Sequence, residues 1–200
     1  MLKPLLLVCL STIVHTPTDV ALVCPEPFRD AMAPWIAHRS AQGYRVLNVS
    51  SADSPKAIRD RILSLHEKDG LAAVVLVGDA EPGCRRDAAL RARCVPTFYE
   101  RAEVNVLWGS EPHLSTDNPY ADVDGDGLPD VPLGRLAADS PVELREIVRK
   151  TLAHERSTDF GIWRRRLNVI AGVGGFGRLA DLVLESTARY LLTSNVPPQY

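Results

Sequence analysis

Short apolar runs alternate with longer amphipathic segments in the first part of the chain. The runs Asp19–Cys24, Tyr44–Val49 and Leu71–Val77 read as strands. The third is apolar at nearly every position, which is typical of a strand buried on both faces of a parallel sheet. Between the runs, apolar residues recur at helical spacing over residues 28–42 and 54–69. The order strand, helix, strand, helix, strand predicts a doubly wound α/β sheet.

The alternation breaks over residues 80–114, where charged loops surround two extended segments. The segments 95–101 and 103–108 are predicted to form an extended pair, and residues 87–92 a short helix. A further strand is expected at Val131–Leu136, so the chain returns to the sheet after this irregular region.

The remaining pattern predicts a helix that begins at Ser140 and Pro141, because proline is favoured at the first helical position. An apolar strand at Leu167–Ala171 and a helix over residues 178–193 follow, after which the alternation calls for another strand. With no repeats and no low-complexity linker, residues 19–200 are predicted to form one domain, incomplete at its C-terminus.

The stretch Ser115–Arg135 concentrates acidic and glycine residues between these elements. Four aspartates have the spacing of a calcium loop: Asp122, Asp124, Asp126 and Asp130. Alternate carboxylates can turn inward to one hard cation, while Gly125 and Gly127 allow the positive φ angles of a tight loop. The twelfth position of an EF-hand would need an acid but is Leu133, so we predict a linear calcium loop that leads into a strand. The alternative is a solvated acidic turn without an ion.

Composition excludes several classes of function. The chain is 46% hydrophobic and 24% charged with a net charge of -2, which fits a globular domain and gives no attraction to nucleic acid. The four cysteines form no CxxC pair, which argues against a zinc ribbon or a thioredoxin-like site. Cys84 lies between acidic and basic neighbours and is interpreted as an inert loop cysteine, or as a partner for Cys94; the sequence does not decide between the two.

The N-terminus has features of a secretory leader. Lys3 precedes the apolar run Leu5–Val14, which has the length of a signal-peptide core but is too short to span a bilayer. We therefore expect residues 1–18 to be a signal peptide or leader and the protein to be extracellular or periplasmic. The alternative is an uncleaved leader to the first strand in a cytoplasmic protein.

Other catalytic motifs are weak or absent. Gly172, Gly174 and Gly177 match GxGxxG between a strand and a helix, which suggests a nucleotide site, but no strand follows with the ribose-binding acid. A glycine turn that lets strand and helix pack closely is the favoured interpretation. The sequence contains neither GxSxG nor HExxH, so serine-hydrolase and zinc-hydrolase chemistry have no support.

Together these segments resemble the N-terminal part of the catalytic domain of gingipain-type cysteine peptidases, a bacterial family with a caspase-like α/β fold. The resemblance covers residues 19–200 and is carried by VALVCPEPFRDAMAPWIAHRSAQGYRV, VVLVGDAEP, STDNPYADVDGDGLPDVPLGRLAADS and IAGVGGFG. It implies a three-layer sandwich around a mainly parallel sheet. It also implies proteolysis of peptide or protein substrates by a histidine and a cysteine.

The family's catalytic histidine lies in a Gly-His-Gly context and its cysteine follows the next strand. This sequence has no His-Gly dipeptide and no cysteine after Cys94, so no catalytic residue is assigned and the 200 residues are expected to be inactive alone. The resemblance places Asp117 beside the pocket that, in arginine-specific members, takes the substrate side chain preceding the cut bond; the alternative is that Asp117 is part of the calcium turn. The alternatives are a calcium-stabilised binding module without catalysis and a nucleotide-binding protein.

Overall fold

The computed structural model describes residues 19–51, 54–80, 87–102, 112–166 and 177–195. The chain divides into two units, the first ending at Glu155 and the second beginning at Arg156. Each unit is described by itself below. The prediction of a single domain over residues 19–200 stays a prediction.

The first unit is built on a four-stranded sheet. Its strands are β1 (Asp19–Val23), β2 (Arg45–Val49), β3 (Ala73–Val77) and β6 (Leu133–Leu136). They lie in the order β2-β1-β3-β6, and every neighbouring pair is parallel. All five residues of β1 are buried, as expected for a central strand covered on both faces. The predicted parallel α/β sheet is therefore confirmed.

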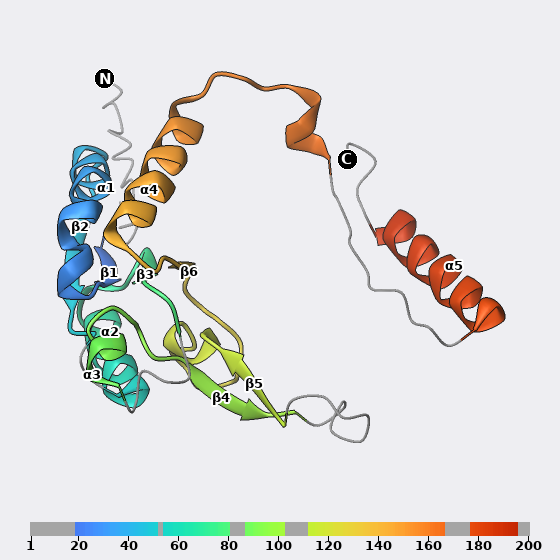
Figure 1. The fold of residues 1–200 in the computed structure, drawn as a ribbon, viewed down its shortest axis with the longest axis horizontal. Helices are drawn as coiled ribbons and strands as arrows, with labels where there is room; N and C mark the ends of the chain where they lie inside the picture. The colour runs from blue at the N-terminus through green and yellow to red at the C-terminus, as the bar shows by residue number, and fades with distance from the viewer. Residues whose placement is uncertain (1–18, 52–53, 81–86, 103–111, 167–176, 196–200) are drawn as a thin grey trace, which may run out of the picture. The chain divides into compact units, whose positions relative to one another are not determined.

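Helices cover both faces of this sheet (Figure 1). On one face lie α1 (Arg29–Ala41), which follows the short 3₁₀ helix η1 (Glu26–Phe28), and α4 (Pro141–Arg156). On the other face lies α2 (Pro55–Asp69). The α1 and α4 face is filled mainly by Val20, Leu22, Phe28, Met32, Trp35, Leu144 and Val148. The α2 face is filled mainly by Val23, Ile58, Ile62, Val74, Leu76, Val95 and Tyr120.

Local sequence explains where these helices begin and end. The Ser54 hydroxyl accepts a hydrogen bond from the Ala57 amide at 3.2 Å and caps α2, which begins with Pro55. The same helix ends just before Gly70, because the φ of +72° at this glycine is incompatible with an α-helix. In α4, the buried residues recur every four positions and form one apolar face toward the sheet: Leu144, Val148 and Leu152.

The irregular region contains the short helix α3 (Ala88–Arg91) and a two-stranded antiparallel sheet. Strand β4 (Phe98–Arg101) pairs with β5 (His113–Thr116), in a register that places Phe98 opposite Thr116. The predicted partner, residues 103–108, lies outside the described residues, and the strand at His113–Thr116 was not predicted. The pairing is set by contacts at the base of the hairpin and not by closeness in sequence. There the Thr97 hydroxyl contacts the Thr116 carbonyl oxygen, and the Phe98 ring packs against Tyr120.

The second unit contains the 3₁₀ helix η5 (Ile162–Arg165) and the helix α5 (Arg178–Asn195). The predicted strand Leu167–Ala171 and the predicted glycine turn lie outside the described residues, apart from Gly177. Large apolar side chains of α5 are exposed, among them Leu179, Leu182 and Tyr190. No helix among the described residues is long and apolar enough to cross a membrane.

Candidate functional site

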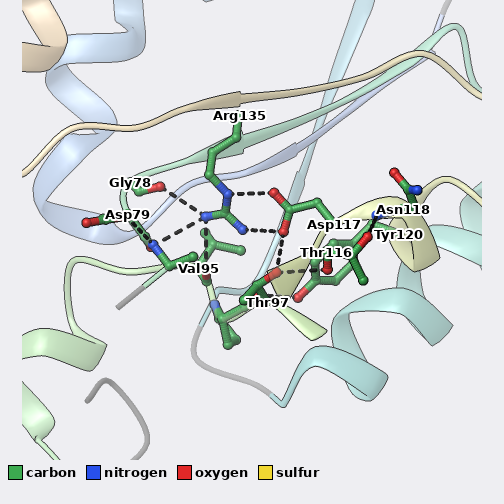
Figure 2. A network of polar contacts seen from close by, with 11 residues as sticks. Gly78, Asp79, Val95, Thr97, Thr116, Asp117, Asn118, Tyr120 and Arg135 are labelled. Carbon is green, nitrogen blue, oxygen red and sulfur yellow. Dashed lines mark hydrogen bonds and ion pairs between the residues drawn. The ribbon is translucent and has the colours of Figure 1, made fainter. Parts of the chain in front are cut away.

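A partly buried ion pair lies beside the carboxyl end of the sheet (Figure 2). Arg135 of β6 donates from Nε to Asp117 Oδ2 at 2.7 Å and from Nη2 to Asp117 Oδ1 at 2.8 Å. Its remaining nitrogen, Nη1, donates to the carbonyl oxygens of Gly78 and Val95, both at 3.0 Å. The two charged side chains are only 13% and 23% exposed. One guanidinium therefore joins three separate backbone segments in a bidentate geometry that lysine could not reproduce.

The turn after β3 places two of these acceptors. Gly78 has a φ of +99°, and a Cβ at this position would lie 2.4 Å from the Arg93 carbonyl oxygen, so only glycine fits. The next residue, Asp79, forms an isolated parallel bridge with Cys94, and its carbonyl oxygen accepts from the Val95 amide at 3.1 Å. The turn thus brings residues 94–97 to the carboxyl ends of β3 and β6.

Hydrogen bonds and a ring contact next to the ion pair hold residues 95–98 in place. The Thr97 hydroxyl lies 2.8 Å from Asp117 Oδ1 and 2.8 Å from the Thr116 carbonyl oxygen. The hydroxyl of the fully buried Tyr120 donates to the Pro96 carbonyl oxygen. The Tyr120 ring also packs edge-on against Phe98, with ring centroids 5.0 Å apart. These contacts anchor the base of the β4–β5 hairpin at this edge.

The surroundings of Asp117 favour its ionised form. Burial by itself raises the pKa of the carboxyl, but the hydrogen bonds and the charge of Arg135, together with the hydrogen bond from Thr97, outweigh it. The pKa of Asp117 is therefore lower than its ordinary value. Asp117 is therefore an anion at neutral pH, and its charge is matched by Arg135.

The acidic loop follows five residues after Asp117. Carboxylate oxygens of Asp122, Asp124 and Asp130 lie within 4.8 Å of one another. Asp126 is not in this group, and its carboxylate instead accepts from the Leu128 amide at 2.8 Å. The oxygen-only donor set is the type that calcium prefers. The predicted role of these four residues as metal ligands stays a prediction.

Glycine backbone shapes this loop around its one buried acid. Asp122, 8% exposed, accepts hydrogen bonds from the amides of Gly125 at 2.7 Å and Gly127 at 3.2 Å. Both glycines have positive φ, at +84° and +89°, as the sequence predicted for a tight turn. The loop then leads into β6 and into no second helix, which confirms that it is not an EF-hand.

Arg59 of α2 holds the beginning of the loop against the body of the domain. Its Nε donates to the Pro119 carbonyl oxygen at 2.7 Å, and its Nη2 donates to the Asp122 carbonyl oxygen at 2.8 Å. The local sequence gave no signal for this contact or for the roles of Arg135 and Thr97. Each of these contacts joins residues far apart in the sequence. Hydrophobic periodicity and turn motifs carry no information about such contacts.

Other candidates from the sequence are not brought into this site by the described structure. The thiol of Cys24 is buried, and desolvation raises its pKa to about 11, which makes it a poor nucleophile. Cys84 and most of the glycine turn lie outside the described residues. His38 lies on α1, where its Nε2 is 3.3 Å from Glu155 Oε2 of α4. That contact ties two helices together and does not reach the carboxyl edge.

Comparison with known proteins adds to this geometry. The model of peptidase family C25 matches residues 13–199. Lys-gingipain and Lys-gingipain W83 of Porphyromonas gingivalis are each 27% identical to this chain over 155 residues, covering 72% of it. The chain spans about 8% of the length of these relatives. A solved structure titled "Structure of Protease" has a TM-score of 0.50 at 23% identity, over 70% of this chain and 29% of that chain. This likeness concerns the fold and is consistent with the predicted caspase-like sandwich.

Proposed function

Because the chain belongs to peptidase family C25, we propose that residues 19–195 form part of a cysteine endopeptidase domain that hydrolyses peptide bonds in protein substrates. The family match over residues 13–199 is the observation that carries this proposal. No His-Gly dipeptide and no cysteine after Cys94 occur in the sequence. No residue of this segment is therefore assigned to the catalytic histidine or cysteine, and we expect the 200-residue chain alone to be inactive.

The contribution of this segment is to the substrate side of the domain. In open α/β sheets, ligands bind in the crevice outside the carboxyl ends of the strands. Asp117 lies at that edge beside the end of β3, on a scaffold that Arg135, Thr97 and Tyr120 hold in place. We assign it to the substrate-binding edge as a residue that orients the peptide and takes no part in bond cleavage.

The acidic loop is the place for a structural calcium ion. Three carboxylates within 4.8 Å of one another repel each other unless a cation neutralises them, and their oxygens suit a hard cation. Asp122, Asp124 and Asp130 would supply the side-chain ligands. The ion would stabilise the turn that leads into β6 and would take no part in catalysis.

We place the protein outside the cytoplasm. Lys3 and the apolar run Leu5–Val14 match the first two regions of a secretory signal. A calcium loop of modest affinity is filled at the millimolar calcium concentrations found outside cells. Fusion of residues 1–18 to a reporter that is active only after export would test this; retention of the reporter in the cytoplasm would contradict it.

Peptidase activity tests the main proposal. The 200-residue chain and the full-length gene product are purified and assayed with fluorogenic peptides in the presence of a thiol reductant. We expect cleavage only by the full-length product and its loss after thiol alkylation. Thiol-dependent cleavage by the 200-residue chain would overturn the assignment of the catalytic pair to other residues.

The acidic loop also favours a second candidate function, a calcium-stabilised binding module without catalysis. Absence of thiol-dependent activity from the full-length product would support this module and reject the peptidase. The same assay therefore separates the two functions.

A further inference from the structure

A mainly apolar cavity opens at the amino edge of the sheet, where β1 and β3 begin. Its volume is about 280 Å³. The floor is formed by Val20, Ala73 and Val75 on the α1 and α4 face of the sheet. The walls include the rings of Trp35, on α1, and Tyr44, directly before β2. We call this space the amino-edge cavity.

The floor of the amino-edge cavity is less covered than the opposite face of the same strand. Along β3, Val74 and Leu76 belong to the α2 face and are 1% and 0% exposed, whereas Ala73 and Val75 are only half-buried. A strand between two neighbours in a parallel sheet is normally covered on both faces. An apolar group that enters the cavity would therefore complete the cover of this face.

The charged side chain at the rim, Arg39, does not require an acidic occupant. Its Nη1 donates to Glu155 Oε2 at 3.0 Å and to Gln42 Oε1 at 2.8 Å. Its guanidinium lies 5.2 Å from the centre of the Trp35 ring. The charge is thus matched within the chain, and a charged occupant would lose its hydration among apolar walls without compensation. The cavity suits an uncharged apolar side chain.

The segment before β1 is placed to supply such a side chain. Strand β1 begins at Asp19 and Val20 lines the cavity, so residues 13–18 are joined to the chain at its edge. Their sequence is two apolar residues followed by His-Thr-Pro-Thr, in which the proline favours a turn. The connection from Val14 to Asp19 can span up to about 17 Å, which is enough for the chain to turn back over the cavity.

The family match supports this choice of segment. The model of peptidase family C25 matches from residue 13 and not from Asp19, so Ile13 and Val14 belong to the pattern that the chain shares with the family. The apolar residues Leu5–Leu10 lie outside the match. Attachment next to the cavity also gives residues 13–18 a high effective concentration there, which a separate partner lacks.

We propose that the apolar side chains of Ile13 and Val14 dock in the amino-edge cavity, so that residues 13–18 are part of the folded domain and not of a removable leader. A leader that is cut off then ends within residues 1–12, because a cut after residue 18 would uncover Trp35 and the floor of the cavity. The inference does not depend on where peptides bind or on which residues cleave them.

Paired serine substitutions in the 200-residue chain test this. Ile13→Ser with Val14→Ser removes the docking side chains and should lower Tm by about 5 °C or more, since burial of one large aliphatic side chain is worth several degrees in a chain of this size. The matched control, Leu5→Ser with Leu6→Ser, removes a similar apolar surface outside the segment and should leave Tm within about 2 °C. Equal changes in the two variants would overturn the inference.

A substitution in the floor tests the cavity itself. Ala73→Leu places a larger apolar side chain where the segment would dock. In the unsubstituted chain it competes with the segment and should lower Tm, whereas in the Ile13→Ser, Val14→Ser variant it replaces the lost cover and should raise Tm. The same effect on Tm in both backgrounds would contradict docking in this cavity.

Thiol accessibility decides the question if the leucine variant does not fold. In the otherwise unsubstituted chain, Val14→Cys should react with a maleimide at least about tenfold more slowly than Leu6→Cys, because only a docked side chain must open before it reacts. Labelling at each position is measured by peptide mass spectrometry. Equal rates for the two cysteines would overturn the inference.

Discussion

Replacing Asp117 with asparagine should destabilise the first unit much more than removing an exposed acid. The amide keeps one oxygen that can accept from Arg135, but its NH₂ group faces a second guanidinium donor, so one charge-assisted hydrogen bond and the ionic attraction are lost. Breaking a fully buried pair costs about 3–5 kcal/mol. Because this pair is partly exposed and two carbonyl oxygens still accept from Arg135, we expect about 2–3 kcal/mol.

Thermal and urea unfolding of the 200-residue chain, followed by circular dichroism, measure this loss. A loss of about 2–3 kcal/mol corresponds to a fall in Tm of about 5–10 °C for a chain of this size. Glu146→Gln is the matched control, because Glu146 pairs with Arg149 at 2.9 Å with both side chains mostly exposed. That control should change the free energy of unfolding by less than about 0.5 kcal/mol.

The pH dependence separates an ionic effect from a packing effect. The pKa of Asp117 is lower in the folded chain than its ordinary value, so its stabilising contribution is complete above the ordinary carboxyl range and is lost as the pH falls through the folded pKa. The difference between the unsubstituted chain and Asp117→Asn should therefore be constant between about pH 5 and pH 7 and shrink below about pH 4. A difference under about 0.5 kcal/mol at pH 7, or one that persists unchanged at low pH, would refute the reasoning.

Two other predictions concern backbone and metal. Asp124→Asn should reduce the rise in Tm that calcium produces, whereas Asp126→Asn should retain most of it, since only Asp124 belongs to the group of converging carboxylates. The absence of any calcium-dependent rise in the unsubstituted chain would reject the ion. Gly78→Ala should cost about 2–4 kcal/mol, because its Cβ would meet the Arg93 carbonyl oxygen at 2.4 Å, whereas Gly125→Ala, with open space around it, should cost about 1 kcal/mol of backbone strain. Equal losses for the two alanine variants in urea unfolding would contradict this.

Sequence reasoning was most accurate where a single local cause decides the structure. The β-rich runs located β1, β2, β3 and β6; for β1 and β3 the reason is that a strand buried between helices must be apolar along its length. Caps and prolines located the beginnings of α2 and α4 in the same way. The partner of β4 was missed, because an antiparallel pair with a longer connection is set by contacts at its base and leaves no periodic signal.

The sequence could not reveal the interactions of Arg135 for a related reason. In the sequence it is one arginine near the end of a short strand, and its four partner residues, Gly78, Asp79, Val95 and Asp117, come from segments before β6 that are separated along the chain. Only the parallel order of β3 and β6 brings those segments to one edge. Charge pairing of this kind depends on topology, so it becomes visible only after the sheet order is known.

One short turn positions both the ion pair and the acidic loop. This explains why residues 115–135 need several specific residue types in a fixed order. The 3₁₀ helix η4 (Asn118–Tyr120) begins with the Asp117 carbonyl oxygen accepting from the Tyr120 amide at 2.9 Å, and the Asp122 amide donates to Asn118 at 3.1 Å. Tyr120 fills the α2 face of the core between them. Asp117 and Asp122 are thus fixed through one buried residue, so a change in the backbone at the acidic loop must displace Asp117 or break η4. This shared backbone requires an acid, a proline turn, a buried tyrosine and positive-φ glycines in one order, and few unrelated sequences would meet that requirement.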